Sequence, residues 1–448
     1  MKRNFILLLS AAFILISSCK KETPDPSLPA TSPVPGFYSQ GSIFILSFER
    51  LDTLLITNSG SVPLNWALSI DTGYLSAVPA SGVIQAGQLM RVLLKAAPSV
   101  PENSSFNTIA KLTGNGVSKE IEIKYGPEDK GRTFLPAETI KDVAFDQLNS
   151  MLYFISGNST SLFRYDLKTA AFDKLPVNYR PTCIGISPDS KYAAIGQDGK
   201  VTFVDLANFT VNKTADVGFE VYDIEMSNND MAYLSANAES GLYGLSLAGA
   251  SVFNFSIQNF REKQINLALD AGGQFIYCAT TQSSDNTVSK MSLGNDTPYL
   301  YRSTTHGAGA NIWLSENGKL LFGDVGNVFN SDDLSSSGSF SNRGRITYAA
   351  HSLKQHSAYV VLNNIFTEVR PDVYVFDPAT FALKGTIKMD KYVHINYQAT
   401  KTELEAEPRF IFYNKDQDEL LLVTRLTDVI NNIEAPLRFP WSLQRIRL

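Results

Sequence analysis

The segment Ile184–Ile195, IGISPDSKYAAI, sets the fold because its pattern recurs along most of the chain. Two short apolar runs flank a polar turn, which is the pattern of a β-hairpin. Each repeat places one small polar residue where the first apolar run ends, and we use this residue as a turn marker. The turn markers are Asp146, Ser187, Ser227, Asp270, Ser315, Ser352 and Asn414.

The spacing of the turn markers predicts how these hairpins assemble. Most neighbouring markers lie about 37–45 residues apart, which is the length of a four-stranded propeller blade. The markers therefore predict an all-β, seven-bladed propeller over residues 131–448. The last repeat ends with Trp441–Leu448 as its third strand. We expect Arg132–Pro136 to supply the fourth, because closing the ring removes an open sheet edge.

The turn SPDSK at Ser187–Lys191 resembles the Ser-Pro-Asp-Gly-Lys turn of YVTN-type and WD40-like propellers. With the repeats around it, this resemblance covers residues 131–448 and implies a member of that broad superfamily. The Tyr-Val-Thr-Asn motif itself and a regular Trp-Asp dipeptide are absent from the sequence, which leaves the subfamily open.

Residues 36–127 carry short strands of a different kind, without repeats. Apolar runs such as Ile43–Leu46 and Val92–Leu94 are separated by Gly-, Ser- and Asn-rich turns, and no helical period of useful length appears. A segment of this length with several short strands predicts a small immunoglobulin-like β-sandwich.

This first domain resembles the BACON domain, an Ig-like module of Bacteroidetes surface proteins. The resemblance rests on an Asn-x-Gly turn at Asn58–Gly60, a core tryptophan at Trp66 and a Pro-x-Ser-Gly turn at Pro79–Gly82. In that family the module often accompanies carbohydrate-active domains, and the resemblance implies a spacer rather than a binding domain. We expect Trp66 to pack inside the sandwich rather than to serve as a ligand platform.

Residues 1–18 have the pattern of a lipoprotein signal peptide. Lys2 and Arg3 precede an apolar run, Phe5–Ile16, which is too short to span a bilayer. The small residues before Cys19 resemble the lipobox of bacterial lipoproteins, which implies cleavage before Cys19 and acylation of its thiol.

Residues 19–35 follow as the acylated cysteine and a flexible tether rich in Pro, Ser and Thr. The charged residues directly after Cys19 are similar to the export signal of Bacteroidetes surface lipoproteins. We therefore predict a lipid-anchored protein of the outer membrane, facing the cell surface, with the periplasmic face as the alternative.

The composition excludes several classes of protein. The 448 residues carry a net charge of −5, with 44% hydrophobic and 19% charged residues, so the signature of disorder is absent. A pI of about 5.6 argues against a nucleic-acid partner. With three Cys, four His and no HExxH or GxSxG motif, the sequence predicts no metal site, no cofactor and no catalytic residue. Cys183 and Cys278 are expected to be buried free thiols.

The predicted binding site is the mouth of the central channel. We expect it to be lined by the connections that lead from the fourth strand of one blade to the next blade, since loops on a rigid scaffold often carry function. Their aromatic and charged side chains can contact sugar faces and hydroxyls. The candidates are Tyr179, Arg180, Phe219, Glu220, Arg261, Glu262, His306, Arg343, Arg345, Tyr392 and His394.

Three long connections are expected to reach one face of the ring at the sixth and seventh blades. They are Asn363–Pro371, Asp390–Pro408 and Thr424–Pro440. Long loops on a compact domain are often functional.

The leading hypothesis is a non-catalytic cell-surface lipoprotein whose propeller binds a glycan or a protein partner, with the sandwich as a spacer. An enzyme acting on a carbohydrate or a lactone is one alternative, because propellers with similar repeats include lactonases and polysaccharide lyases. A scaffold subunit of an outer-membrane transport complex is another. The fold alone does not decide among them.

Overall fold

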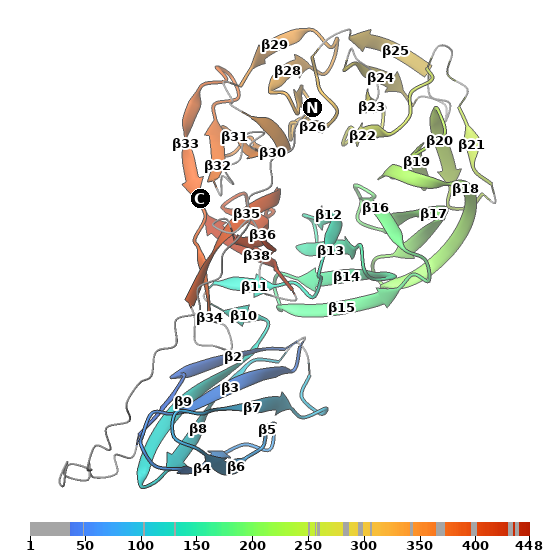
Figure 1. Cartoon of the computed structure of the whole chain (residues 1–448). Coiled ribbons are helices and arrows are strands. Elements are labelled where there is room, and N and C mark those ends of the chain that lie inside the picture. The colour runs from blue at the N-terminus through green and yellow to red at the C-terminus, as the bar shows by residue number, and fades with distance from the viewer. Residues whose placement is uncertain are drawn as a thin grey trace, which may run out of the picture.

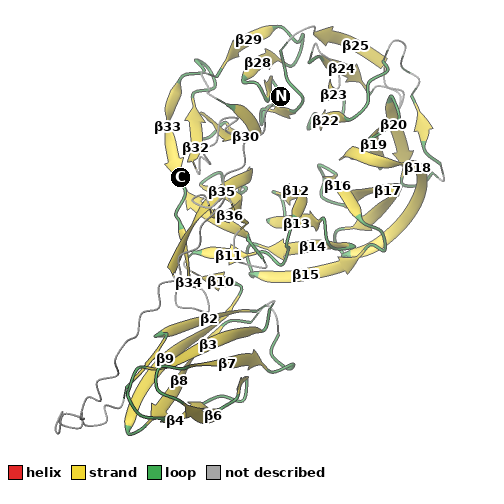
Figure 2. Cartoon of the chain, viewed as in Figure 1, coloured by secondary structure: helices red, strands yellow, loops and turns green. Residues whose placement is uncertain are grey.

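The computed structural model describes residues 36–448 except 48, 102–103, 130, 250, 256, 258–259, 281–285, 294–298, 305–306, 341–343, 364–371, 396–400, 429–432 and 435–438. All regular elements of this part are β-strands (Figure 2), which confirms the all-β prediction. Within the same residues, no helix is long and apolar enough to cross a membrane. The predicted signal peptide 1–18, Cys19 and the tether 19–35 lie outside the described residues.

The first domain is a sandwich of two sheets that enclose one core (Figure 1). Trp66 is confirmed as a core residue, since only 3% of its surface is exposed and it packs with side chains of both sheets. In spatial order, one sheet holds β1 (Phe37–Ser39), β3 (Leu51–Asn58), β7 (Leu89–Ala96) and β5 (Leu75–Val78), and the other holds β2 (Ser42–Leu46), β9 (Val117–Gly126), β8 (Phe106–Gly114), β4 (Leu64–Ile70) and β6 (Ser81–Ile84).

The rest of the chain forms a ring of seven blades, which confirms the predicted propeller (Figure 1). Four blades are separate four-stranded sheets. Blade 1 is β12 (Ile140–Asp146), β13 (Met151–Ser156), β14 (Ser161–Asp166) and β15 (Ala171–Pro176); blade 4 is β22 (Ile265–Leu269), β23 (Phe275–Thr280), β24 (Val288–Ser292) and β25 (Tyr299–Thr304). Blade 5 is β26 (Ile312–Leu314), β27 (Leu320–Gly323), β28 (Asn327–Asn330) and β29 (Ser336–Ser339); blade 6 is β30 (Arg345–Ser352), β31 (Ser357–Asn363), β32 (Asp372–Phe376) and β33 (Leu383–Lys388).

Blades 2 and 3 are joined by long strands that serve two positions each. Gly199, with φ of 74°, bends β17, and β17 thereby provides the second and third strands of blade 2. Strand β18 begins as the fourth strand of blade 2 and continues as the innermost strand of blade 3. In order, the strands are β16 (Pro181–Ile186), β17 (Tyr192–Asp205), β18 (Thr210–Met226), β19 (Met231–Ala236), β20 (Leu242–Ser246) and β21 (Phe253–Asn254).

The turn markers have a common structural role. The Ser187 hydroxyl accepts hydrogen bonds from the N–H groups of Lys191 and Tyr192, and the Asp270 carboxylate accepts one from Phe275 N–H at 2.6 Å. Each marker is followed within four residues by one residue with positive φ, which reverses the chain. These residues are Ser150, Ser190, Asp230, Gly273, Gly318, His356 and Gln417.

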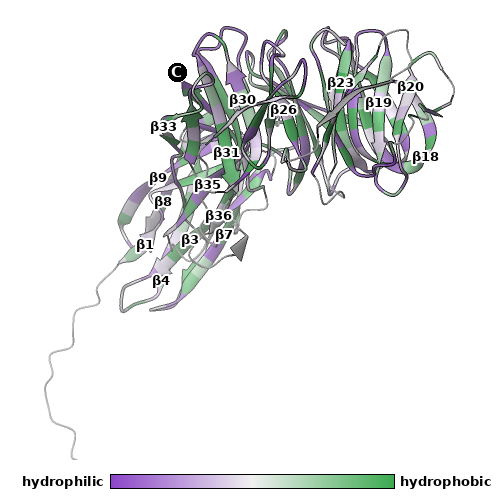
Figure 3. Ribbon diagram, turned by 90° about the horizontal axis from the view of Figure 1, so that it is seen from above, coloured by the Kyte–Doolittle hydropathy of each residue, from purple (hydrophilic) through white to green (hydrophobic). Residues whose placement is uncertain are grey.

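The hydrophobic cores of the ring lie between neighbouring blades. Val143 and Leu152 of blade 1, for example, share one cluster with Leu421 and Leu443 of blade 7. Figure 3 shows the ring edge-on, with hydrophobic residues concentrated in its strands. Because each blade is stabilised mainly by its two neighbours, a ring of this length needs no single central core.

The seventh blade combines both ends of the propeller region, as predicted. The innermost strand β35 (Lys401–Tyr413) is followed by β36 (Glu419–Asp428) and β38 (Trp441–Arg447). The strand that precedes blade 1, β11 (Arg132–Phe134), pairs antiparallel with β38 and is continued by β10 (Glu128–Asp129). The ring is therefore closed by main-chain hydrogen bonds between its two ends.

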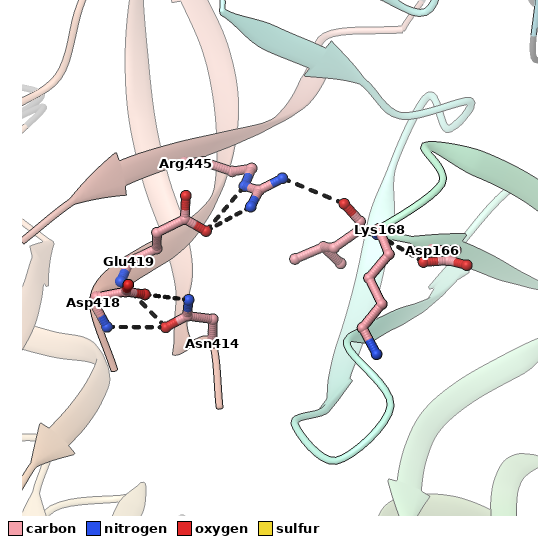
Figure 4. Close-up of polar contacts among 7 residues, drawn as sticks. Asp166, Lys168, Asn414, Asp418, Glu419 and Arg445 are labelled. Carbon is pink, nitrogen blue, oxygen red and sulfur yellow. Dashed lines mark hydrogen bonds and ion pairs between the residues drawn. The ribbon is translucent and has the colours of Figure 1, made fainter. Parts of the chain in front are cut away.

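A polar seam joins blade 7 to blade 1 (Figure 4). Arg445 of β38 forms an ion pair with Glu419 at 2.6 Å and donates to the carbonyl of Leu167, which follows the third strand of blade 1. The adjoining turns are closed by their own side chains, with Asn414 bonded to Asp418. This seam is half-exposed, so its contribution to stability is small.

Two of the long connections form hairpins that extend blade 7. Part of Asp390–Pro408 is β34 (Tyr392–Ile395), which pairs with the beginning of β35. Part of Thr424–Pro440 is β37 (Ile433–Glu434), which pairs with the end of β36. Most of the third connection, Asn363–Pro371, lies outside the described residues.

The sandwich meets the ring at blade 7 through a short, packed junction. Strand β9 leads directly into β10 and β11, and the Phe134 N–H donates to the Pro127 carbonyl at 2.7 Å. Phe44 of the sandwich packs on Phe134 with ring centroids 6.2 Å apart, and Leu46 contacts the same core. The two domains therefore share an apolar contact as well as the chain.

Candidate functional site

The innermost strands of the blades surround a central channel with a volume of about 790 Å³. Its wall is made of the first strand of every blade rather than of the connections between blades. Alternate residues of a strand point to the same side, so two successive positions of each strand can face the channel.

Two rings of side chains form the channel wall. The upper ring, which we define as the residues four before each turn marker, consists of Asp142, Cys183, Asp223, Asn266, Asn311, Tyr348 and Phe410. The lower ring, the residues two before each marker, consists of Ala144, Gly185, Glu225, Ala268, Trp313, Ala350 and Phe412. In the upper ring, blades 1–5 carry polar or thiol groups and blades 6 and 7 carry aromatic rings. The channel is thus divided into a polar arc and an aromatic arc.

The aromatic arc is a continuous group of rings. Tyr348 lies 5.5 Å from both Phe410 and Phe412 and 5.9 Å from Trp313, measured between ring centroids. Phe145 extends the group into blade 1, at 5.6 Å from Phe412. Such a surface offers flat apolar faces to a ligand.

The polar arc is held in place by hydrogen bonds between blades. Asp142 accepts from Val143 N–H of its own strand at 2.8 Å and from Ile184 N–H of blade 2 at 3.0 Å. Asp223 repeats this arrangement, accepting from Ile224 N–H at 2.9 Å and from Leu267 N–H of blade 4 at 2.7 Å. Each carboxylate therefore links two neighbouring blades as well as facing the channel.

Burial alters the charge of these carboxyl groups. It raises the pKa of Asp142 to about 6 and that of Asp223 to about 7, although the backbone hydrogen bonds act in the opposite direction. Burial also raises the pKa of Glu225 well above its usual range, and the nearby Asp223 and Asp142 add to the shift. Near neutral pH the polar arc therefore contains carboxyl groups that can both donate and accept hydrogen bonds.

These raised pKa values predict that the protein loses stability as the pH rises. In the unfolded chain Asp ionises near 3.8, whereas Asp223 ionises near 7 in the folded ring. Between these values the folded state binds more protons, so the free energy of unfolding falls with increasing pH. We expect a lower melting temperature at pH 7.5 than at pH 5, and a smaller difference in Glu225→Gln. A melting temperature that rises over this interval would contradict the assignment.

The thiols and histidines of the ring have structural environments. Cys183 and Cys278 are free and buried, as expected, and burial raises the pKa of both thiols, so neither is an activated nucleophile. His351 is packed in its strand with 6% of its surface exposed, and burial lowers its pKa. Among the described residues, no group of three or more His, Cys, Asp or Glu side chains is arranged to hold a metal ion.

The predicted mouth residues of blades 1–3 lie outside the channel wall. Tyr179 and Arg180 are exposed, and Lys200 lies over the Tyr179 ring at 4.9 Å. Phe219 packs on Tyr243 within the core of blades 2 and 3, with ring centroids 4.5 Å apart. Because these connections pass outside the first strands, their side chains do not line the cavity.

Glu220 and Glu262 are engaged in local hydrogen bonds. The carboxylate of Glu220 accepts from Asn237 at 2.7 Å, and that of Glu262 accepts from Thr280 at 3.1 Å. Arg261, next to Glu262, is exposed. None of these three residues is among those that line the described channel.

The predicted mouth residues of the later blades are also dispersed. Arg345 is exposed and forms an ion pair with Asp324 at 2.9 Å. The prediction for Tyr392 is wrong, because its ring is buried at 7% exposure and packs edge-on against Phe134 at 5.3 Å. This burial follows from β34, which folds back onto blade 7. His306, Arg343 and the side chain of His394 lie outside the described residues.

Comparisons with known proteins agree with the fold. No family model and no curated protein matches the sequence. Among solved structures, the Cps50 (Swd1) β-propeller domain of Myceliophteria thermophila is similar with a TM-score of 0.52 and 14% identity, over 70% of this chain and 97% of that domain. A chain in the crystal structure of the mitotic checkpoint complex is similar with a TM-score of 0.50 and 11% identity, over 72% of this chain and 95% of that one. At such identities the likeness shows the propeller fold alone.

Proposed function

We propose that this protein is a non-catalytic binding protein whose propeller holds part of a glycan in its central channel. The observation that carries the proposal is the division of the channel into an aromatic arc and a polar arc. A sugar ring has an apolar face and a hydroxyl edge, and these match the two arcs. Asp142 and Asp223 are held by backbone N–H groups, so the polar arc is preorganised.

In the same proposal, the protein is a lipoprotein anchored through Cys19, with the sandwich as a spacer that holds the ring away from the membrane. The lipobox-like sequence before Cys19 supports the anchor. Incorporation of labelled palmitate into the wild-type chain but not into Cys19→Ala tests it.

A glycan array with the chain from Lys20 onward tests binding, because this chain keeps every described residue. For the best ligand, we expect Trp313→Ala to weaken binding about tenfold, since it removes one ring of the aromatic arc. Titration calorimetry on the wild type and the variant measures this change.

Tyr179→Ala is the matched control, because Tyr179 is an exposed aromatic residue outside the channel. If Tyr179→Ala abolishes binding and Trp313→Ala does not, the site lies on the rim instead. Release of glycan products during the array would contradict a purely binding role.

A further inference from the structure

Glu225 is the charged member of the lower ring, on the innermost strand of blade 3. The lower-ring residues of the neighbouring blades 2 and 4 are Gly185 and Ala268, and their small size leaves the channel beside Glu225 open. The Glu225 carboxyl group accepts a hydrogen bond from Leu269 N–H of blade 4. A carboxylate has about four lone-pair sites, so this bond leaves capacity for a ligand donor.

The aromatic arc faces this carboxyl group across the channel. Blade 3 stands on the opposite side of the ring from blades 6 and 7, which carry Tyr348 and Phe412 (Figure 1). Burial raises the pKa of Tyr348 above its ordinary value, and the charges of Asp142 and Glu225 add to the shift. Because such an effect weakens with distance, the two carboxyl groups and the Tyr348 ring border the same part of the channel.

The carboxyl groups of the channel lack a basic partner within the described part of the chain. Lys141 and His351 are the basic residues of the described channel wall. Lys141 is exposed, and its side chain lies beside Gly157. The imidazole of His351 accepts a hydrogen bond from Glu316 N–H at 3.4 Å, and burial lowers its pKa, so it is neutral near pH 7. Neither residue therefore compensates the charge of the carboxyl groups.

The remaining titratable side chains of the described wall supply no positive charge either. The Glu316 carboxylate accepts a hydrogen bond from Leu353 N–H at 2.7 Å. Burial raises the pKa values of the other groups, so they are uncharged near pH 7; they are Cys183, Tyr222 and Tyr413. Acidic groups removed from water without a cation to pair with them are uncommon, since a buried charge is usually paired.

A cationic group on the ligand would supply the missing counter-charge. An ammonium group is attracted by a carboxylate and by the faces of aromatic rings, and tryptophan attracts it most strongly. Trp313 belongs to the lower ring together with Glu225, and its ring centroid lies 5.9 Å from that of Tyr348. The channel therefore offers a cation both kinds of partner at the same level.

We propose that the glycan held in the channel is an amino sugar, whose ammonium group lies between the Glu225 carboxylate and the aromatic arc. The inference rests on the proposed function. The ammonium group favours the ionised carboxylate, so the Glu225 proton passes to the solvent as the ligand binds. The hydroxyl groups of the sugar meet the polar arc at Asp142 and Asp223.

The test compares three tetrasaccharides that share one linkage and differ in one substituent of each sugar. The glucosamine tetramer carries an ammonium group, the N-acetylglucosamine tetramer an acetamide and cellotetraose a hydroxyl. At pH 6 we expect the chain from Lys20 to bind the glucosamine tetramer about tenfold more tightly than either of the others. Calorimetry in two buffers with different enthalpies of ionisation should show that protons are released when this tetramer binds, and proton uptake would overturn the inference.

Glu225→Gln keeps an acceptor for the Leu269 N–H but cannot ionise. We expect this variant to lose both the preference for the glucosamine tetramer and the proton release. Glu220→Gln is the matched control, because Glu220 lies on the same strand but outside the channel, where its carboxylate accepts from Asn237. The control should keep the preference. Matching thermal melts of the two variants at pH 6 exclude misfolding as the cause of a change.

Three results would overturn the inference and leave the proposed function standing. They are equal or tighter binding of a neutral tetramer, a preference that survives Glu225→Gln, and failure of all three tetramers while other glycans bind on the array. Spermine carries ammonium groups without a sugar, so spermine that binds as tightly as the glucosamine tetramer would show that the amino-sugar assignment is wrong. No binding of any glycan, in this test or on the array, would overturn the proposed function and the inference with it.

Discussion

Arg132→Ala should lower the free energy of unfolding of the propeller by about 3–5 kcal/mol, the largest effect that we expect from one substitution. Arg132 lies on β11, the strand that closes the ring, and only 1% of its surface is exposed. Its guanidinium donates to the Asp390 carbonyl. In the amide orientation that satisfies both side chains, the Gln444 oxygen accepts from it at 2.8 and 2.9 Å.

The cost of this substitution has two parts. Alanine leaves a cavity where the long side chain was, and it leaves the Gln444 and Asp390 acceptors without their donor. Burial already lowers the pKa of Arg132 to about 10, so the group stays charged at neutral pH. Arg132→Lys keeps the charge but loses the forked geometry, and we expect an intermediate result.

Urea unfolding followed by tryptophan fluorescence measures the effect of Arg132→Ala. Arg445→Ala is the control, because Arg445 also bridges blades 7 and 1, through its hydrogen bond to the Leu167 carbonyl, but lies in the half-exposed polar seam. It should cost no more than about 1 kcal/mol. Equal losses in the two variants would show that the buried guanidinium is not what holds β11 to β38.

Gly185→Ala should destabilise the ring by about 3 kcal/mol and weaken ligand binding. Gly185 belongs to the lower ring, on the innermost strand of blade 2. A Cβ atom there would lie 2.6 Å from the Ile224 carbonyl oxygen and 3.1 Å from the Glu225 Cα. Both atoms are backbone, so no side-chain rotation relieves the contact and blade 3 must move.

Gly385→Ala is the matched control for Gly185→Ala. Gly385 lies in the outer strand β33, where an added Cβ meets no atom within 4 Å. This variant should be neutral or more stable by about 0.5–1 kcal/mol, because alanine loses less backbone entropy on folding. Thermal and urea unfolding of both variants compare them, and a Gly185→Ala protein as stable as Gly385→Ala would show that blades 2 and 3 can separate freely.

The architecture of the ring was predictable because each sequence repeat corresponds to one blade. Each marker, such as Ser187 or Asp270, closes a turn that every blade requires. The number of markers along the sequence therefore gives the number of blades. The closing strand was predictable because the last repeat is one strand short. The sandwich core was predictable from the place of Trp66 among short β-prone runs.

The lining of the channel was harder to predict because it depends on local irregularities of the innermost strands. The registers of β12, β16 and β30 shift near the beginnings of these strands, and the register of β18 shifts where it enters blade 3, which alters where the following side chains point. A signal was nonetheless present, since Asp142 and Asp223 both stand four residues before a turn marker. Comparing that position across the repeats would have identified the upper ring.

The prediction for Tyr392 was wrong for another reason. Tyr392 is buried because β34 folds onto blade 7, and this pairing involves residues that no repeat pattern describes. Contacts of this kind depend on register, which the sequence of a single strand does not specify.

The packed junction between the sandwich and blade 7 determines the direction in which the channel faces. Phe44 rests on Phe134, and only Pro127 separates β9 from β10, so the ring has little freedom to swivel on the sandwich. A flexible linker would let the channel sample every angle. Here the short connection and the apolar contact restrict the angle between the channel axis and the sandwich, so aligning the sandwich on a surface would also orient the channel.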